Sequence, residues 1–230
     1  MSHHYLKFDN VSFSYSDNFE VLKNISFTIE HGEKVAILGN NGAGKSTLLM
    51  HMNGLLLPSK GEINIGGIKI CKETLPLVRQ SVGMVFQNAD DQLFMPTVYD
   101  DVAFGPLNMK LPPDVVDNQV KTALESVNAY HLKNRACHQL SGGQKRIVAI
   151  ATVLSMQPNI LVMDEPSANL DLTSRRNLIN IIKSFTHTCV IATHDLELAI
   201  ELCDRAILME NGTIKDDSST KDIISSYRNS

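Results

Sequence analysis

Two short stretches of this chain combine glycine with residues that bind phosphate. Residues 39–47 read Gly-Asn-Asn-Gly-Ala-Gly-Lys-Ser-Thr. The glycines leave room for backbone N–H groups to face phosphate oxygens, while Lys45 can reach the outer phosphates of a triphosphate and Ser46 can hold Mg²⁺. Residues 140–144 read Leu-Ser-Gly-Gly-Gln. A serine hydroxyl and two glycine amides at a helix start would add to the positive end of the helix dipole, so the sequence predicts a second anion pocket.

The surroundings of the first stretch indicate a nucleotide-binding loop. Residues 34–38 form a short apolar run typical of a buried strand, and residues 46–53 have the pattern of a helix that Gly54 can end. Strand, glycine loop and helix follow in the order that this chemistry requires. The second stretch is less specific, because a serine before a helix is also an ordinary N-cap.

A pair of carboxylates follows another apolar run. Residues 160–163 lead directly into Asp164 and Glu165. Ligands of α/β sheets bind at the carboxyl ends of the strands, so we expect both side chains at the nucleotide. Asp164 should hold the water shell of Mg²⁺, and Glu165 should polarise the water that attacks the γ-phosphorus.

Three further residues have both a functional and an ordinary interpretation. His194 follows the run at 189–192 and could reach the γ-phosphate, although a histidine in such a place is often structural. Gln87 could offer its amide to Mg²⁺ or to the attacking water. Tyr15 could stack on adenine or pack within the N-terminal strands.

Composition restricts the class of protein. The 230 residues suffice for one core, or for one core with a small lobe. The 21 Lys and Arg against 25 Asp and Glu give no overall electrostatic footprint for nucleic acid. Four scattered cysteines without a Cys-x-x-Cys pair indicate neither zinc nor disulfides and favour a reducing cytosol. The N-terminus lacks a leader pattern and the apolar runs are too short to span a bilayer, so we expect a soluble chain.

The order of elements predicts an α/β fold with two additions. Residues 11–13 and 24–29 alternate like strands of an antiparallel flap. Further strands are expected at residues 34–38, 62–65, 82–85, 160–163, 189–192 and 205–209. The alternation of the last three of these strands with helical segments predicts a largely parallel sheet covered by helices.

The segment 88–139 changes character and becomes helical. Thr97 should open a helix that Gly105 and Pro106 stop, and Pro113 should start another. We therefore expect one domain over 1–230, in which 1–87 and 140–230 form the core with its flap and 88–139 form a helical subdomain. The residues from Asp216 onward are predicted to be a short helix or a frayed tail.

In order and context, these motifs resemble the ATP-binding cassette (ABC) family of P-loop NTPases over nearly the whole chain. The resemblance implies a RecA-like, mostly parallel sheet with helices on both faces, a Walker A loop at 39–47, a signature motif at 140–144, and a D-loop within 167–171. It makes Asp164 and Glu165 the Walker B pair. Gln87 becomes the Q-loop glutamine, Asp171 the D-loop aspartate and His194 the switch histidine.

The resemblance also implies which residues meet ATP and Mg²⁺. ATP would contact Tyr15, Gly39, Asn40, Asn41, Gly42, Ala43, Gly44, Lys45, Ser46 and Thr47. Mg²⁺ would be held by Ser46, Gln87 and Asp164. Hydrolysis would depend on Glu165, His194, Gln87 and Lys45. A second ATPase subunit, arranged head to tail, would supply Ser141, Gly142, Gly143, Gln144 and Asp171 to the same ATP.

Within the family, residues 85–94 and 101–106 are similar to the ATPase subunits of energy-coupling factor importers, which carry cobalt, nickel or vitamins. Residues 193–198 look more like the cobalt and nickel members. The expected partners are a second ATPase subunit, a homologous or identical chain, together with transmembrane subunits and a substrate-capture membrane protein. The expected location is peripheral, on the cytoplasmic face of the bacterial cell membrane.

Several alternatives stay open at this point. The chain could serve a vitamin importer of the same group, another ABC transporter, or a non-transport ABC ATPase of DNA repair, chromosome organisation or translation. Many ATPases of the energy-coupling group continue into an extra C-terminal domain, whereas here little follows Lys215. This puts in doubt a nucleotide-free dimer held by such a domain.

Overall fold

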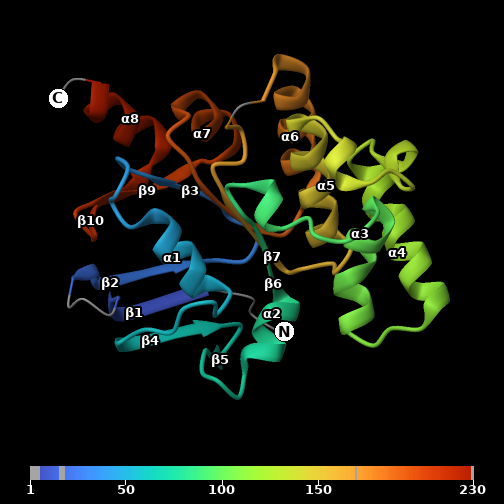
Figure 1. Cartoon of the computed structure of the whole chain (residues 1–230). Coiled ribbons are helices and arrows are strands. Elements are labelled where there is room, and N and C mark those ends of the chain that lie inside the picture. The colour runs from blue at the N-terminus through green and yellow to red at the C-terminus, as the bar shows by residue number, and fades with distance from the viewer. Residues whose placement is uncertain (1–5, 16–18, 169, 229–230) are drawn as a thin grey trace.

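The N-terminal part of the chain contributes an antiparallel sheet, which is drawn at the lower left of Figure 1. The computed structural model describes residues 6–15, 19–168 and 170–228. The sheet has the order β2-β1-β4-β5, and its neighbouring strands are antiparallel. Its strands are β1 (Leu6–Ser14), β2 (Glu20–Ile29), β4 (Lys60–Ile65) and β5 (Ile68–Lys69). The predicted antiparallel flap is therefore confirmed.

A six-stranded sheet with the order β10-β9-β3-β8-β7-β6 forms the centre of the molecule. Its strands are β3 (Lys34–Leu38), β6 (Val82–Val85), β7 (Ile160–Asp164), β8 (Thr188–Ala192), β9 (Arg205–Glu210) and β10 (Thr213–Ser219). All neighbours are parallel except β9 and β10, so the predicted mostly parallel sheet is confirmed. Strand β10 was not predicted, because it is a polar edge strand without a buried side chain and shows no apolar alternation.

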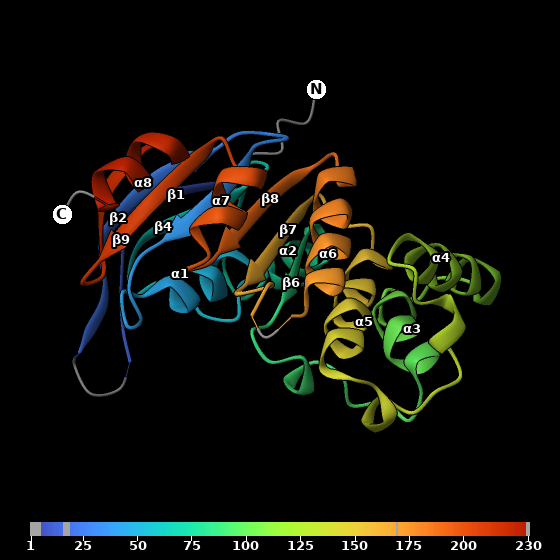
Figure 2. The same cartoon turned by 90° about the horizontal axis from the view of Figure 1, so that it is seen from above.

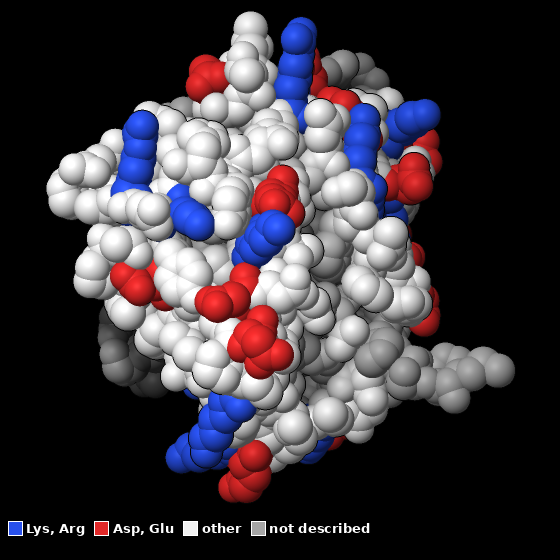
Figure 3. All heavy atoms as spheres, turned by 90° about the vertical axis from the view of Figure 1, so that its right-hand side faces the viewer, with Lys and Arg blue, Asp and Glu red and all other residues white. Residues whose placement is uncertain are grey.

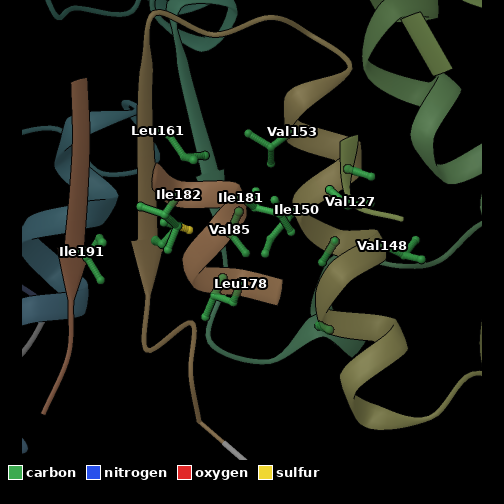
Figure 4. Close-up of a cluster of buried hydrophobic side chains, with 14 of the residues drawn as sticks. Val85, Val127, Val148, Ile150, Val153, Leu161, Leu178, Ile181, Ile182 and Ile191 are labelled. Atoms are coloured by element: carbon green, nitrogen blue, oxygen red, sulfur yellow. The ribbon is translucent and has the colours of Figure 1, made fainter. Parts of the chain in front are cut away.

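Alternate residues of the central sheet face two separate cores. Val35 and Ile37 of β3 pack toward the four-stranded sheet and helix α1 (Lys45–Met52). Ala36 and Leu38 face the opposite core. Figure 4 shows that core, in which side chains of α5 (Gly142–Leu154) and α6 (Leu172–Ser184) point toward β6 and β7. Each fully buried aliphatic side chain there contributes about 1.5–3 kcal/mol, which seats α5 firmly against the sheet.

Residues 88–139 fold into helices α3 (Val98–Asn108) and α4 (Pro113–Ser126) with short 3₁₀ turns. Figure 2 shows both helices at one end of the molecule, with α5 and α6 between them and the sheet. Helix α4 buries one apolar stripe, Val116, Val120, Ala123 and Leu124. On the face at this end, acidic and basic side chains are interspersed, with uncharged surface between them (Figure 3).

Helix α3 continues past the point where the sequence predicted its end. Thr97 caps the helix as expected, but the helix runs through Pro106 to Asn108. A proline removes the N–H that would bond the carbonyl four residues earlier. Here the Ser155 hydroxyl donates to the Val102 carbonyl at 2.8 Å. The prediction was wrong because the compensating group lies 53 residues away along the chain.

Three short helices complete the described structure. Helix α2 (Leu75–Ser81) precedes β6, α7 (Leu196–Leu202) follows β8, and α8 (Thr220–Arg228) closes the described chain. The predicted helix for the C-terminal residues is thus correct for 220–228 and wrong for 216–219, which belong to β10. None of the helices in the described ranges combines the length and hydrophobicity that crossing a bilayer requires.

Candidate functional site

Four neighbouring parallel strands bring the predicted residues to one edge of the central sheet. Residue 39 follows β3, Gln87 lies two residues after β6, Glu165 follows β7, and His194 lies two residues after β8. Their segments surround a cavity of about 460 Å³. Its lining consists of Val21, Asn41, Gly42, Gly44, Lys45, Ser46, Thr47, Gln87, Asp164, Glu165 and His194.

The glycine loop requires glycine at two places for steric reasons. A Cβ at Gly39 would lie 2.3 Å from the Met209 carbonyl oxygen. Gly44 has φ +99° at the start of α1, a conformation that side chains disfavour. Lys45 is 7% exposed, and its Nζ donates to the carbonyls of Gly39 (2.8 Å) and Asn40 (3.2 Å). The ammonium is therefore held at the cavity wall by the loop itself.

Ser46 and Asp164 form a pair of oxygen donors that suits Mg²⁺. Burial raises the pKa of Asp164, and the hydrogen bond from Ser46 and the charge of Lys45 oppose that rise. A carboxylate that is costly to ionise in isolation favours a cation beside it. Mg²⁺ is bound by one or two carboxylates together with substrate phosphates, so these residues fit the ion. The exposed Gln87 lines the same cavity and offers a further oxygen.

Glu165 is buried and held in place by residues at and just after the end of β8. Its Oε2 accepts from the Thr193 hydroxyl (3.2 Å) and from the His194 backbone N–H (3.3 Å), and lies 2.8 Å from His194 Nδ1. Its own N–H donates to the Ala192 carbonyl at 2.8 Å. The residue has φ +46°, an uncommon backbone conformation that costs energy and is often found at functional sites. The arrangement directs one buried carboxylate to the cavity beside an exposed imidazole.

The second predicted anion pocket lies outside this cavity. Ser141 is the N-cap of α5 and forms a reciprocal capping box with Gln144, at 3.3 Å and 3.0 Å. Ser141 and Gly142 are exposed. The described lining of the cavity includes none of residues 140–144.

Asp171 also lies outside the cavity and caps another helix. It is the N-cap of α6 and accepts from the backbone N–H groups of Thr173 and Ser174, both at 2.9 Å. These bonds lower the pKa of Asp171. A Cβ at Gly143 would lie 2.7 Å from Ser174 Oγ, so the two helix starts are closely packed. Residue 169, within the expected D-loop, lies outside the described residues.

Tyr15 lies at the rim of the site. Its hydroxyl is 3.3 Å from Thr47 Oγ1, and its ring meets Phe13 edge to face at 4.9 Å. The residue is 46% exposed. Both interpretations drawn from the sequence are compatible with this position, and contact with adenine stays a prediction.

Two residues at the site were not found by sequence reasoning. Thr193 precedes His194 directly, and its position after a buried strand could have indicated it. Arg146 is 6% exposed and donates to the backbone carbonyls of Phe86 and Gln87. No sequence signal identifies such a residue, because its partners are backbone atoms.

Curated relatives cover almost the whole chain. The Geobacter sulfurreducens protein GSU1281, named as an ABC transporter ATP-binding protein, is 53% identical over 223 residues, 97% of this chain and 90% of the relative. The energy-coupling factor transporter ATP-binding protein EcfA of Methanocaldococcus jannaschii is 46% identical over 218 residues, 93% of this chain and 78% of the relative.

Solved structures share the fold over nearly the whole chain. CbiO1 of Clostridium perfringens, described as part of the ABC transporter complex CbiONQ, superposes with a TM-score of 0.87 at 39% identity, covering 98% of this chain and 92% of CbiO1. The ATP-binding cassette MJ0796, a dimer bound to ADP and Pi after hydrolysis, gives a TM-score of 0.83 at 28% identity, covering 94% and 98%. Residues 22–168 match the ABC transporter family model. The chain therefore belongs to the ABC transporter family and is one of its ATPases.

Proposed function

We propose that the chain is the ATP-hydrolysing subunit of an energy-coupling factor importer and works as half of a head-to-tail pair. One observation carries the proposal. The cavity at the sheet edge holds groups for one side of a nucleotide, while the exposed Ser141 helix start lies outside it. A second subunit that places its Ser141 helix start over the cavity would complete the site. The dimeric MJ0796 cassette supports this arrangement.

Each residue then has a defined task in hydrolysis. The loop amides and Lys45 bind the phosphates, and Ser46 and Asp164 would hold Mg²⁺, which would neutralise phosphate charge when bound. Glu165 accepts a proton from the attacking water. Thr193 and His194 orient the Glu165 carboxylate by the contacts described above, and Gln87 positions the water or the ion. Asp171 and the Ser141 helix start act on the partner's ATP, where the positive helix end stabilises anionic charge.

Transport requires membrane subunits, and a groove beside the site suits their docking. The groove has about 570 Å³ and lies between the core and residues 88–139, which we propose to be a helical subdomain. Phe94 (63% exposed) and Phe104 (42% exposed) meet there edge to face at 5.0 Å. A contiguous exposed apolar surface in a groove is typical of a site of interaction with another protein. We propose that a cytoplasmic segment of a transmembrane subunit fills this groove, with the ATPase peripheral on the cytoplasmic face of a bacterial membrane.

The cargo is proposed to be cobalt or nickel ions. EcfA, by its name, belongs to an energy-coupling factor transporter, and CbiO1 to the CbiONQ complex. The similarity of residues 193–198 to cobalt and nickel members favours a metal over a vitamin.

Purification of the assembled membrane complex tests the proposal. We expect the chain to co-purify with transmembrane and substrate-capture proteins, and the complex to contain cobalt or nickel by elemental analysis. A complex that holds a vitamin would refute the cargo. Two results together would refute the docking groove. One is hydrolysis that membrane subunits do not affect, and the other is unchanged association of the Phe94→Ala chain with those subunits.

A further inference from the structure

Residues 86–92 and helix α5 are tied together by side-chain hydrogen bonds. Gln92 Oε1 accepts from the Phe86 N–H at 3.1 Å. The Gln92 Nε2 group donates to the Ala149 carbonyl and to the Thr152 hydroxyl, each at 2.8 Å. The segment that carries Gln87 is thus attached to the helix that begins at the signature motif.

Arg146 makes the link that lies nearest the nucleotide cavity. Its Nη1 donates to the Phe86 carbonyl at 2.7 Å, and its Nη2 donates to the Gln87 carbonyl. These carbonyls lie on either side of the Gln87 Cα, so the two bonds fix the backbone from which the amide side chain extends. Burial lowers the pKa of Arg146, and the charge of Asp164 opposes this. Burying the Arg146 cation costs free energy of desolvation, and leaving it buried without its carbonyl partners would cost more.

The same guanidinium belongs to the first turns of α5. A helix rises about 1.5 Å per residue, so Gly142 and Arg146 are separated by about 6 Å on one rigid element. Any displacement of the Gln87 backbone therefore acts on the helix start that presents Ser141 and Gly142 to solvent.

We propose that Arg146 is a positioning residue that couples Gln87, at this chain's own nucleotide, to the Ser141 helix start, at the partner's nucleotide. The inference rests on the proposed head-to-tail pair. When Gln87 engages the γ-phosphate end of bound ATP, the two carbonyls held by Arg146 shift, and the guanidinium transmits the shift to α5. Occupancy of one site is thereby sensed at the other.

Three substitutions separate this role from a purely structural one. Arg146→Met removes both hydrogen bonds and keeps an unbranched apolar side chain in place of the aliphatic part of arginine. Arg146→Lys keeps the charge and one bond. Lys145→Met is the matched control on the same helix, because Lys145 pairs at 2.6 Å with the exposed Asp90 and such surface pairs contribute little.

Amide hydrogen exchange in a monomer gives a readout independent of hydrolysis. Gly142→Glu serves as the common background, because a Cβ at Gly142 meets nothing within 4 Å and the carboxylate repels the partner's phosphates. Sedimentation verifies the monomer. Addition of Mg²⁺ and a non-hydrolysable ATP analogue should slow exchange at residues 144–150 about tenfold in the background and in Lys145→Met. The same addition should slow this exchange less in Arg146→Lys, and should leave it unchanged in Arg146→Met. Protection of residues 40–47 should be equal in all four.

Steady-state kinetics in the otherwise unchanged chain provide the second test. We expect Arg146→Met to lower kcat about tenfold with KM within about twofold, and Arg146→Lys to recover part of the loss. Equal protection of residues 144–150 in Arg146→Met and the background, or an unchanged kcat in folded Arg146→Met, would overturn the coupling. Absence of protection at residues 40–47 in the background would instead overturn nucleotide binding at the loop, and the coupling with it.

Discussion

Glu165 is the residue whose geometry makes the sharpest chemical prediction. Its carboxylate is buried, oriented by Thr193 and His194, and open to the cavity. Glu165→Gln preserves the shape and removes the proposed base, so we expect hydrolysis to fall at least about a hundredfold while ATP binding persists. Single-turnover kinetics and filter binding measure the two effects. Near-normal hydrolysis in this variant would exclude Glu165 as the base.

Asp164 allows a prediction about stability and pH. Burial raises its pKa above the ordinary 3.8, so the folded protein binds this proton more tightly than the unfolded chain. The stabilisation from protonation is present at acid pH and is lost as pH rises through the raised pKa. Ionised Asp164 is therefore a cost at neutral pH without nucleotide.

We expect Asp164→Asn to raise the Tm of the nucleotide-free chain at pH 7 by a few degrees, since about 1 kcal/mol shifts the Tm of a chain of this size by roughly 2–4 °C. The gain should shrink as pH falls toward the ordinary aspartate pKa, and Mg²⁺ should no longer enhance stabilisation by ATP. Thermal scans at several pH values measure both. An equal or lower Tm at pH 7 would show that Ser46 and Lys45 already compensate the charge.

At the scale of elements, we predict that the continuation of α3 through Pro106 depends on one hydroxyl. Ser155 Oγ donates to the Val102 carbonyl that Pro106 leaves without an N–H, and it also lies 2.9 Å from the Thr152 carbonyl. Ser155→Ala should cost about 1–3 kcal/mol by leaving a buried carbonyl unpaired. In a Pro106→Ala background the restored N–H can bond Val102, so the same change should cost less. Urea denaturation of the unchanged chain, the two single variants and the double variant measures this coupling. Changes in the free energy of unfolding that add within about 0.5 kcal/mol would contradict it.

The nucleotide cavity and helix α3 together show what a sequence can and cannot predict. The strand–loop–helix order around Lys45 and the strand end at Asp164 are local patterns, so the central sheet and its cavity edge were predictable. The path of α3 was not, because it is decided by Ser155, which lies far along the chain. Nor was Arg146, whose partners are backbone carbonyls brought near only by the packing of α5 against the sheet. Local chemistry is visible in sequence, whereas contacts between distant elements are not.

At the scale of the whole molecule, the proposed pair makes two inactive variants complement each other. Gly142→Glu adds a carboxylate where a partner's phosphates would bind, and an acidic residue in the first turn does not weaken α5. Lys45→Met removes the ammonium from the cavity. Gly142→Glu keeps its loop and should still bind ATP, whereas Lys45→Met keeps the Ser141 helix start that it offers to a partner. Each variant alone should hydrolyse ATP at least about a hundredfold more slowly than the unchanged chain.

Mixed in equal amounts, the two variants should regain activity. In each mixed pair, one of the two sites combines an intact Lys45 with an intact Ser141 helix start, so a mixed pair should reach about half of the wild-type rate if the sites act independently. A smaller recovery that depends steeply on ATP would indicate that both sites must close together. No recovery at any mixing ratio, with mixed pairs demonstrated by sedimentation, would mean that one chain encloses its nucleotide without help from the other.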